Sequence, residues 1–520
     1  MASSLLKSGT MLSVLTLASR LLGLLREMTK ARFLGTSALS DAFTVAFVIP
    51  NLLRRLFAEN SISVAFIPTF RNFLAENNKE ETRAFLSSCF TFISFAVTSV
   101  VVLGILITPW IVPFFGTAEA ETVFLTRIMF PYLAVISVAA FFQGILNGVK
   151  IFLPSGFTPV LFNLCVIGFT WLFRDAAGNP ARAMAFGVTA GGCLQAAFQL
   201  PFVLRTGFRF SFTPLRRAFS NPGTRTVLRL VGPTVFGMAA YQLNDLVSTI
   251  LAGNAGEGVV SSLQYSLRLQ ELILGIFAVT IGTVILPDLS GLAAEKRWEG
   301  FNRMLLHAAE SIVLICVPVS VFSWICAEDL VRLLFAGRSF GADSVALTVG
   351  AFRMHTLGLF FIALNRVISP AFYAQHNTKS PTMAGIASFA CNILLALFLA
   401  PVFRGPGIAL ALSLASAANT LFLFLLMRRY PEFSFRTLLA GTAGYTLKIA
   451  LFSAAAGFLL FYFRDSIRSL CAGLGGGKIL QEGLPLCLCA LLFGGTGAAL
   501  LALGRDKLFA SVLSYFRRKK

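Results

Sequence analysis

The chain has 520 residues, of which 56% are hydrophobic and only 13% are charged, and its mean hydropathy is +0.79. A water-soluble protein carries roughly a quarter charged residues, so this composition excludes an ordinary soluble enzyme. The net charge of +20 would suggest nucleic acid in a soluble protein, but most basic residues lie in short loops, where membrane topology explains them, so we expect no nucleic-acid partner.

Apolar runs of about 20 residues or more, the length that a helix needs to cross a bilayer, recur along the chain. Only helices and closed barrels satisfy backbone polar groups in lipid, and barrel strands would be short and alternating. The sequence therefore predicts an all-α polytopic membrane protein. In chain order we expect fourteen spans, near residues 9–34, 42–70, 86–112, 122–147, 153–173, 183–204, 227–252, 260–290, 306–326, 343–371, 382–402, 406–427, 438–463 and 484–504.

The first run contains Arg20 and Arg26 and lacks a convincing cleavage site, so we expect it to be retained as the first span. Basic residues gather in every second connection and in both terminal segments, and the positive-inside rule places these parts, including both termini, in the cytoplasm. The opposite connections are nearly free of basic residues, with the exceptions Arg174, Arg182, Arg332, Arg338, Arg404, Arg464, Arg468 and Lys478.

Two parts of the sequence resemble each other in the same order. The stretch "IPTFRNFLAENNKEETRAFL" is echoed by "LPDLSGLAAEKRWEGFNRML", and Lys150 and Asn163 are echoed by Lys379 and Asn392. The distance in sequence between the similar stretches corresponds to six spans, an even number, so the two repeats would have the same orientation in the membrane. In transporters with such parallel repeats, the substrate binds near the midplane between the halves. We expect six-helix lobes at residues 1–205 and 206–430, and a third part at residues 431–520 that holds spans thirteen and fourteen and a basic tail.

Charged residues inside the spans need an explanation, because each arginine at a helix centre costs roughly 2.5–3.5 kcal/mol. Two pairs have helical spacing and can neutralise each other, namely Arg55 with Glu59 and Arg268 with Glu271. Pairing leaves Arg20, Arg26 and Arg54 without a carboxylate of suitable spacing, since Glu27 follows Arg26 directly and points about 100° away on a helix. Lys30, Arg32 and Asp41 lie near an interface, where their side chains could reach water by snorkelling.

The excess in the first two spans is cationic, so an anion is its natural counterpart. Arginine suits phosphate because its planar fork makes two parallel hydrogen bonds and keeps its charge when desolvated. We expect Gly23 to allow a kink between Arg20 and Arg26, and Pro50 to break the second span just before Arg54. A broken span that lines a cavity is where such charges are tolerated.

Other motifs give no catalytic or metal site. The stretch "AGLGGGKI" lacks the first glycine and the final serine or threonine of a phosphate loop, and His307, His355 and His376 are isolated from one another. The nine cysteines are scattered in apolar runs and are expected to be small buried hydrophobes. We therefore expect no enzyme, no metal and no cofactor.

The segment "SRLLGLLREMTKARFLGTSALSDAFTVAFVIPNLLRRLFAEN" and the stretch "LRLQELILGIFAVTIGTVILPDLS" resemble the MurJ (MviN) family of lipid II flippases, and the likeness covers essentially the whole chain. The resemblance implies two six-helix lobes, as in the superfamily of multidrug and oligosaccharidyl-lipid exporters. It implies a bacterial inner-membrane protein of peptidoglycan synthesis whose partners are lipid II, membrane lipids and other cell-wall synthesis proteins.

The resemblance also implies roles for particular residues. The substrate-binding arginines would be Arg20, Arg26, Arg54, Arg55 and Arg268, and the gate or counter-charge residues would be Asp41 and Glu59. Some members bind sodium through an aspartate on the seventh span, where this chain has Ser248, with Asp245 three residues earlier. Although Asn392 is retained in type, we expect no sodium site.

The resulting hypothesis is alternating access, in which arginines bind the pyrophosphate of lipid II in a central cavity and the membrane potential contributes to its movement. A flippase for another lipid-linked oligosaccharide remains an alternative, because the arginines would read pyrophosphate and not sugar. A multidrug exporter of the same superfamily should favour acidic cavities. A membrane glycosyltransferase lacks its acidic site here, and a scaffold would not explain the buried charges.

Overall fold

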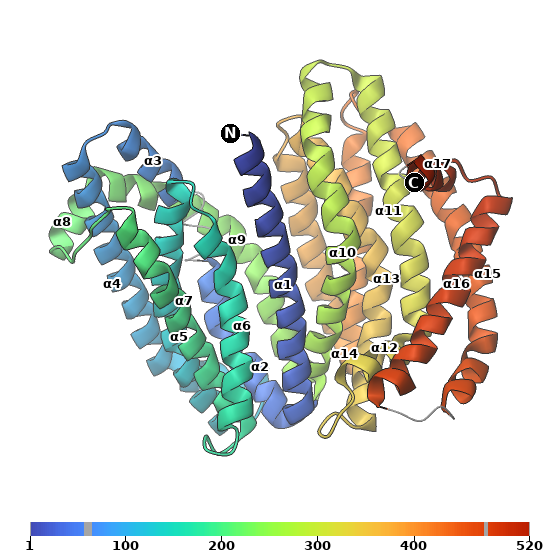
Figure 1. Ribbon diagram of the computed structural model, residues 1–520, viewed down its shortest axis with the longest axis horizontal. Coiled ribbons are helices and arrows are strands. Elements are labelled where there is room, and N and C mark those ends of the chain that lie inside the picture. The colour runs from blue at the N-terminus through green and yellow to red at the C-terminus, as the bar shows by residue number, and fades with distance from the viewer. Residues whose placement is uncertain (1, 57–64, 473–476, 519–520) are drawn as a thin grey trace. The chain divides into compact units, whose positions relative to one another are not determined.

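The computed structural model describes residues 2–56, 65–472 and 477–518 (Figure 1). Within these ranges the regular structure is entirely helical, as expected where every backbone hydrogen bond must close within its own segment in lipid. The predicted all-α polytopic fold class is confirmed.

The helices follow one another with short connections. In chain order they are α1 (Ala2–Leu34), α2 (Ala38–Arg54), α3 (Ile67–Ala75), α4 (Lys79–Ile111), η3 (Val112–Phe115), α5 (Glu119–Gly148), α6 (Leu153–Phe173), α7 (Pro180–Arg205), α8 (Leu215–Ser220), α9 (Pro222–Asn254), α10 (Val259–Ala294), α11 (Trp298–Ile325), α12 (Ala327–Phe335), α13 (Ala342–Tyr373), α14 (Lys379–Met427), α15 (Phe435–Ala472), η4 (Ile479–Gly483), α16 (Leu484–Leu503) and α17 (Lys507–Arg518).

Nine helices in the described ranges are long and apolar enough to cross a membrane. One of them, α14, has a non-helical residue at Arg404 and covers predicted spans eleven and twelve. The first, second, seventh and eighth predicted spans correspond to α1, α2, α9 and α10, which lie outside this set. These four helices carry the candidate residues Arg20, Arg26, Asp41, Arg54 and Arg268.

The chain forms two compact units, residues 1–261 with 338–340 and residues 262–337 with 341–520. These two units are defined by how the helices pack, whereas the predicted lobes are defined by the repeat in the sequence. The predicted lobes therefore stay a prediction. One detail supports the repeat. Asn77 and Lys296, each just before the start of a helix, both have φ of 55°, and they have the same spacing as Pro68 and Pro287.

Phenylalanine dominates the core of the first unit. Phe66 stacks on Phe70 and Phe85 and contacts Phe141, and all four side chains are fully buried. Gly148 makes room for this cluster, since a Cβ there would lie 2.5 Å from the Phe70 ring. In the second unit, α10, α11, α13 and α14 share one apolar core that also includes the connection before α15.

Candidate functional site

Arg26 lies on α1 among an acid and two aromatic rings. Its Nη2 donates a hydrogen bond of 2.8 Å to Glu27 Oε1, and its guanidinium lies 5.7 Å from the Phe47 ring centre and 5.8 Å from that of Phe162. The prediction that Arg26 lacks a local carboxylate is therefore wrong. The two Cα–Cβ bonds diverge, but the long arginine side chain folds back to its neighbour.

The end of α2 carries the next two arginines. Arg54 Nε donates to Asn51 Oδ1 at 3.0 Å, one helical turn earlier. Arg55 pairs with Asp245 of α9 at 3.4 Å, and both side chains are partly solvent-accessible. Its predicted partner, Glu59, lies outside the described residues.

The predicted break at Pro50 is wrong, because α2 continues through this proline to Arg54. The irregularity comes one turn later, where Arg55 and Leu56 are π-helical. Around Gly23, α1 is one continuous helix from Ala2 to Leu34, and the kink expected there stays a prediction. A proline removes one backbone donor, but the helix here tolerates that loss.

Some of the basic residues of α1 and α2 lie on the sides of these helices that face each other. Lys30 donates to Thr44 of α2 and lies 5.9 Å from the Phe43 ring centre, while Arg26 lies over Phe47. Arg54 is seven residues after Phe47, which places it on the same face of α2 and roughly 10 Å further along the helix. We call Arg26, Lys30, Arg54 and Arg55 the α1–α2 cationic strip.

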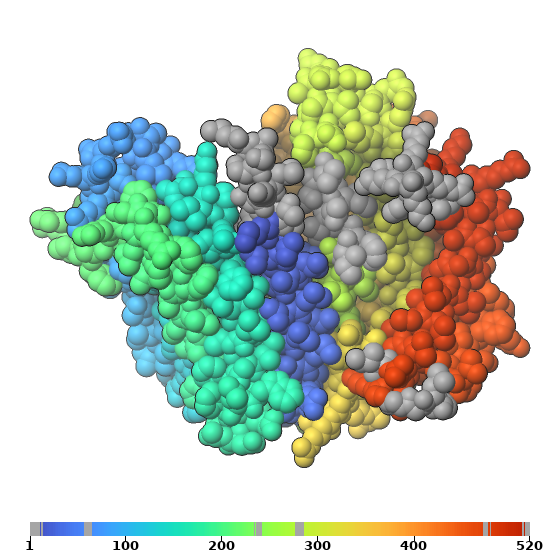
Figure 2. Space-filling model, viewed as in Figure 1, coloured from blue at the N-terminus to red at the C-terminus, as the bar shows by residue number. Residues whose placement is uncertain are grey.

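Arg20 is separate from this strip. It is exposed, and so are its neighbours Leu17 and Leu21, at 58% and 50%. Figure 2 shows α1 in dark blue with its side chains at the surface. Because Arg20 and Arg26 are six residues apart on one continuous helix, their side chains point in different directions.

Asp41 of α2 caps the start of α10. The backbone N–H groups of Gly258 and Ser261 donate to its two carboxylate oxygens at 2.6 and 2.8 Å, and Asp41 is only 2% exposed. In return, Glu257 accepts a hydrogen bond of 2.8 Å from the N–H of Ala38, at the start of α2. The beginnings of α2 and α10 therefore satisfy each other's free backbone donors.

The end of α9 also packs closely against the connection before α5. Asn254, the last residue of α9, donates to the Phe114 carbonyl at 3.0 Å. A Cβ on Gly253 would lie 1.7 Å from the Phe115 carbonyl oxygen, so only glycine allows this approach. The connections before α2, α5 and α10 are therefore closed against one another at one end of the first unit.

Arg268 belongs to the second unit and pairs with Glu271 at 3.0 Å, as predicted. Its neighbours on α10 face α13. Ser266 Oγ is 2.5 Å from His355 Nδ1, and Gln270 Nε2 donates to the His355 carbonyl at 2.7 Å. Since Arg268 lies two residues from each of these, its side chain projects from a different face of α10. It is partly exposed, at 30%.

Two further groups of ion pairs were missed by the sequence reasoning. Lys448 pairs with Asp506 at 2.6 Å, and Arg464 and Arg468 both pair with Asp329, at 2.8 and 2.9 Å. The partners are far apart in the chain, so no spacing rule could have found them. The isolated lysine in span thirteen is explained by this pairing.

No group of three or more His, Cys, Asp or Glu side chains in the described residues could hold a metal ion. Asp245 is directed toward Arg55, and Ser248 is one turn further along α9. The expectation that there is no sodium site stays a prediction.

Comparison with known proteins shows the family of the chain. The family model for the lipid II flippase MurJ matches residues 30–468. The chain is 46% identical to the probable lipid II flippase MurJ of Treponema pallidum (strain Nichols), over 99% of both chains. In fold, it is similar to a solved lipid II flippase MurJ in an inward closed conformation, with a TM-score of 0.77, 24% identity and coverage of 94% of this chain and 98% of that one.

A second solved structure shows the wider fold. It is an inward-facing multidrug resistance MATE family transporter of the MOP superfamily, with a TM-score of 0.65, 14% identity and coverage of 81% of this chain and 95% of that one. The resemblance seen in the sequence is confirmed, and with it the multi-pass membrane character of the protein. The chain belongs to the MurJ family of lipid II flippases, whose members are transporters and not catalysts.

Proposed function

We propose that this protein moves lipid II from the cytoplasmic to the outer leaflet by alternating access. The observation that carries this proposal is the α1–α2 cationic strip within apolar helices. Between Arg20 and Arg55 the sequence has six basic residues and two acidic ones, Glu27 and Asp41. Even with Asp245 beside Arg55, an excess of positive charge remains, and an anionic ligand would balance it.

The chemistry of the strip fits a pyrophosphate. Arg26 and Arg54 offer guanidinium groups that bind phosphate oxygens in pairs, and Arg20, Arg55 and Arg268 act as supporting cations. The Phe47 and Phe162 rings beside Arg26 exclude water and strengthen its interaction with an anion. The polar head group enters this site while the prenyl chain stays in the lipid.

Asp41 serves as a gate residue in this proposal. Its two hydrogen bonds to the start of α10, together with the bond from Ala38 to Glu257, hold one end of the first unit closed. Alternating access requires such bonds to break and form again in each cycle. Glu59 is the second proposed gate or counter-charge residue.

The membrane potential can contribute to the direction of transport. One elementary charge that crosses 100 mV gains about 2.3 kcal/mol. A head group with two uncompensated negative charges would gain roughly 4–5 kcal/mol by moving outward across a membrane that is negative inside. Rearranged protein charges would reduce or reverse this gain, so the calculation gives only the upper size of the contribution from the potential.

The topology belongs to the same proposal, with both termini in the cytoplasm of a bacterial inner membrane. Several basic residues that seemed to violate the positive-inside rule have carboxylate partners. Arg182 pairs with Glu121 at 2.7 Å and Arg332 with Glu328 at 2.7 Å. Pairing removes their net charge, which is compatible with an external location. Contacts with other cell-wall synthesis proteins remain a prediction.

Vesicles that contain the purified protein and fluorescent lipid II test this function. A membrane-impermeant reagent that destroys the outer fluorophore measures how fast lipid II crosses. We expect the double variant R26Q/R54Q to lower the rate by at least about tenfold, since each arginine contributes a charge-assisted contact to the phosphates. The control R216Q/R217Q removes two exposed arginines of α8 and should transport normally.

Two results would change this conclusion. Unchanged transport by the folded double variant would remove the strip from the mechanism. Equal transport of undecaprenyl-pyrophosphate bearing an unrelated sugar would favour the alternative of a flippase for another lipid-linked oligosaccharide.

A further inference from the structure

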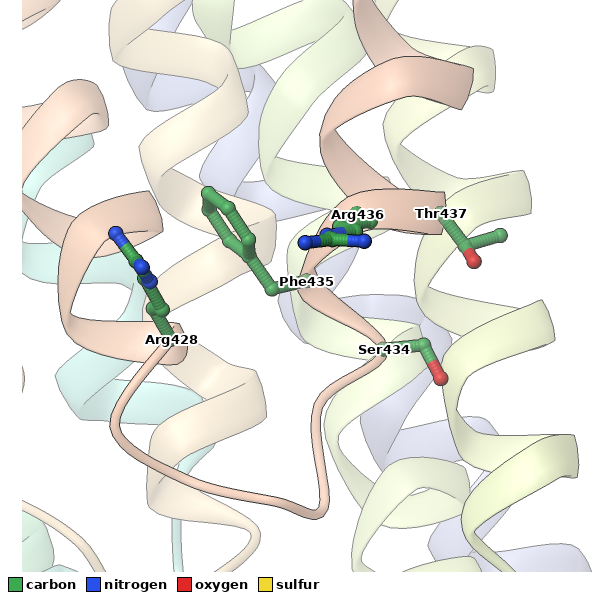
Figure 3. A pocket seen from close by; sticks show the side chains of 5 residues that line it. All are labelled: Arg428, Ser434, Phe435, Arg436 and Thr437. Atoms are coloured by element: carbon green, nitrogen blue, oxygen red, sulfur yellow. The ribbon is translucent and has the colours of Figure 1, made fainter.

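A pocket of about 560 Å³ opens in the second unit where α14 ends and α15 begins. It is lined by Arg428, Ser434, Phe435, Arg436 and Thr437, and Figure 3 shows the Phe435 ring between the two arginine side chains. None of these residues belongs to the proposed transport site.

The connection that forms the pocket is firmly held. Asn302 of α11 donates to the Glu432 carbonyl at 2.8 Å and accepts from the Ser434 N–H at 2.9 Å. Phe433 is buried against the Phe301 and Phe372 rings. Because the backbone is fixed before any ligand arrives, binding here needs little additional ordering.

The five residues that line the pocket include two arginines and no acid, and Glu432 of the same connection has a buried carboxylate oxygen. Arg428 and Arg436 are both exposed, and across residues 2–56, 65–472 and 477–518 no carboxylate forms an ion pair with either. Two guanidinium groups with the Ser434 and Thr437 hydroxyls form a set of hydrogen-bond donors that suits a phosphate group.

Apolar side chains continue from the pocket along both helices. Leu421, Leu425 and Arg428 lie on one face of α14 at helical spacing, and the two leucines are 57% and 49% exposed. On α15, Leu439 follows Arg436 by one turn and is 39% exposed. Both α14 and α15 are long and apolar enough to cross a membrane, so we place the connection between them at the membrane surface and these leucines toward the hydrocarbon.

We infer that this pocket binds the phosphodiester head group of an anionic phospholipid from the surrounding membrane. The two arginines and the hydroxyls contact the phosphate, and the acyl chains lie along the exposed leucines. A free phosphate compound has the same polar chemistry, but it would leave the adjoining apolar surface unused. The bound lipid would fix the connection between α14 and α15 at a place separate from the transport site.

Thermal unfolding of the full-length protein in detergent tests this inference, with phosphatidylglycerol, phosphatidylcholine or glycerol 3-phosphate as the probe. We expect phosphatidylglycerol to raise the unfolding temperature of the wild type at the lowest concentration. The variant R428Q/R436Q should need about tenfold more of this lipid for the same shift, because it lacks two charge-assisted contacts. The control R216Q/R217Q should respond like the wild type.

Each contrary outcome has a distinct meaning. A wild-type response from R428Q/R436Q would overturn the site. An equal response to phosphatidylcholine would contradict the role of net charge, and an equal response to glycerol 3-phosphate would overturn the lipid assignment in favour of a soluble phosphate. If R428Q/R436Q does not fold, R428K/R436K is measured in its place. This variant should bind phosphatidylglycerol more weakly than the wild type, because lysine lacks the planar fork of arginine.

Discussion

Individual charged residues in the apolar helices are held by partners that differ from one residue to the next. Arg26 has an adjacent acid, Arg54 has an asparagine one turn away, and Arg55 reaches an aspartate on another helix. Such contacts lower the cost of placing an arginine in a membrane, which is roughly 2.5–3.5 kcal/mol at the centre. Between Arg20 and Arg55 the basic residues still outnumber the acidic ones, and the proposed binding of an anionic substrate rests on this excess.

Replacing Asp41 by asparagine should weaken the closed end of the first unit. The amide keeps the size of the side chain but offers one acceptor oxygen to two backbone N–H groups. We expect a loss of about 1–3 kcal/mol in stability, visible as a lower unfolding temperature and a slower flip rate. S37A, which removes the cap of α2 and the hydrogen bond from Ser37 Oγ to the Leu34 carbonyl, should cost about 1 kcal/mol. Equal effects of the two variants would argue against a special role for Asp41.

Gly253 offers a purely steric test of the same closure. In G253A the new Cβ would meet the Phe115 carbonyl oxygen at 1.7 Å, so the backbone must shift, at a cost of about 1–3 kcal/mol. In the matched variant G168A, nothing lies within 4 Å of the added carbon. Thermal unfolding should therefore separate the two variants, and similar unfolding temperatures would show that Gly253 is not tightly packed.

At the scale of helices, α17 is attached to the second unit by a polar contact at its first turn. Asp506 accepts hydrogen bonds from Lys448, from Tyr445 and from the N–H of Phe509, at 2.6, 3.1 and 3.0 Å. Burial alone would raise the pKa of Asp506, but these bonds lower it below the ordinary value of 3.8. The side chain thus caps α17 and joins it to α15.

The lowered pKa of Asp506 predicts a pH dependence with a defined sign. A carboxylate with a lowered native pKa stabilises the fold fully above its ordinary value, and this contribution is lost as the pH falls through the native pKa. The protection of the α17 amides from hydrogen exchange, relative to the intrinsic exchange rate at each pH, should therefore fall in acid for the wild type. In D506N this protection should already be low at neutral pH and should change less on acidification. Identical profiles for the two proteins would contradict the attachment.

The helices themselves could be predicted because their length and apolar composition are local properties of the sequence. The pair Arg268–Glu271 was found for the same reason. The pairs of Arg55 with Asp245 and of Lys448 with Asp506 depend on which helices pack together, and one sequence does not contain that information. The expected break at Pro50 was wrong because a proline rule describes local cost, whereas packing around α2 keeps the helix intact.

For the whole molecule, the charge distribution predicts its orientation in the membrane. If both termini are cytoplasmic, a green fluorescent protein fused after Lys520 should fluoresce, and an alkaline phosphatase fused there should be inactive, since each folds on only one side of the bacterial inner membrane. Active phosphatase at this position would contradict the cytoplasmic location of the C-terminus.

The most direct measurement is the leaflet location of lipid II in bacteria depleted of this protein and complemented with wild type, R54A or the control R216Q/R217Q. A membrane-impermeant enzyme that cleaves the exposed head group reports the outer leaflet. We predict that cleavable lipid II disappears on depletion and returns with the wild type and the control, but not with R54A. If lipid II remains cleavable without the protein, this chain moves a different molecule, and the proposed function is contradicted.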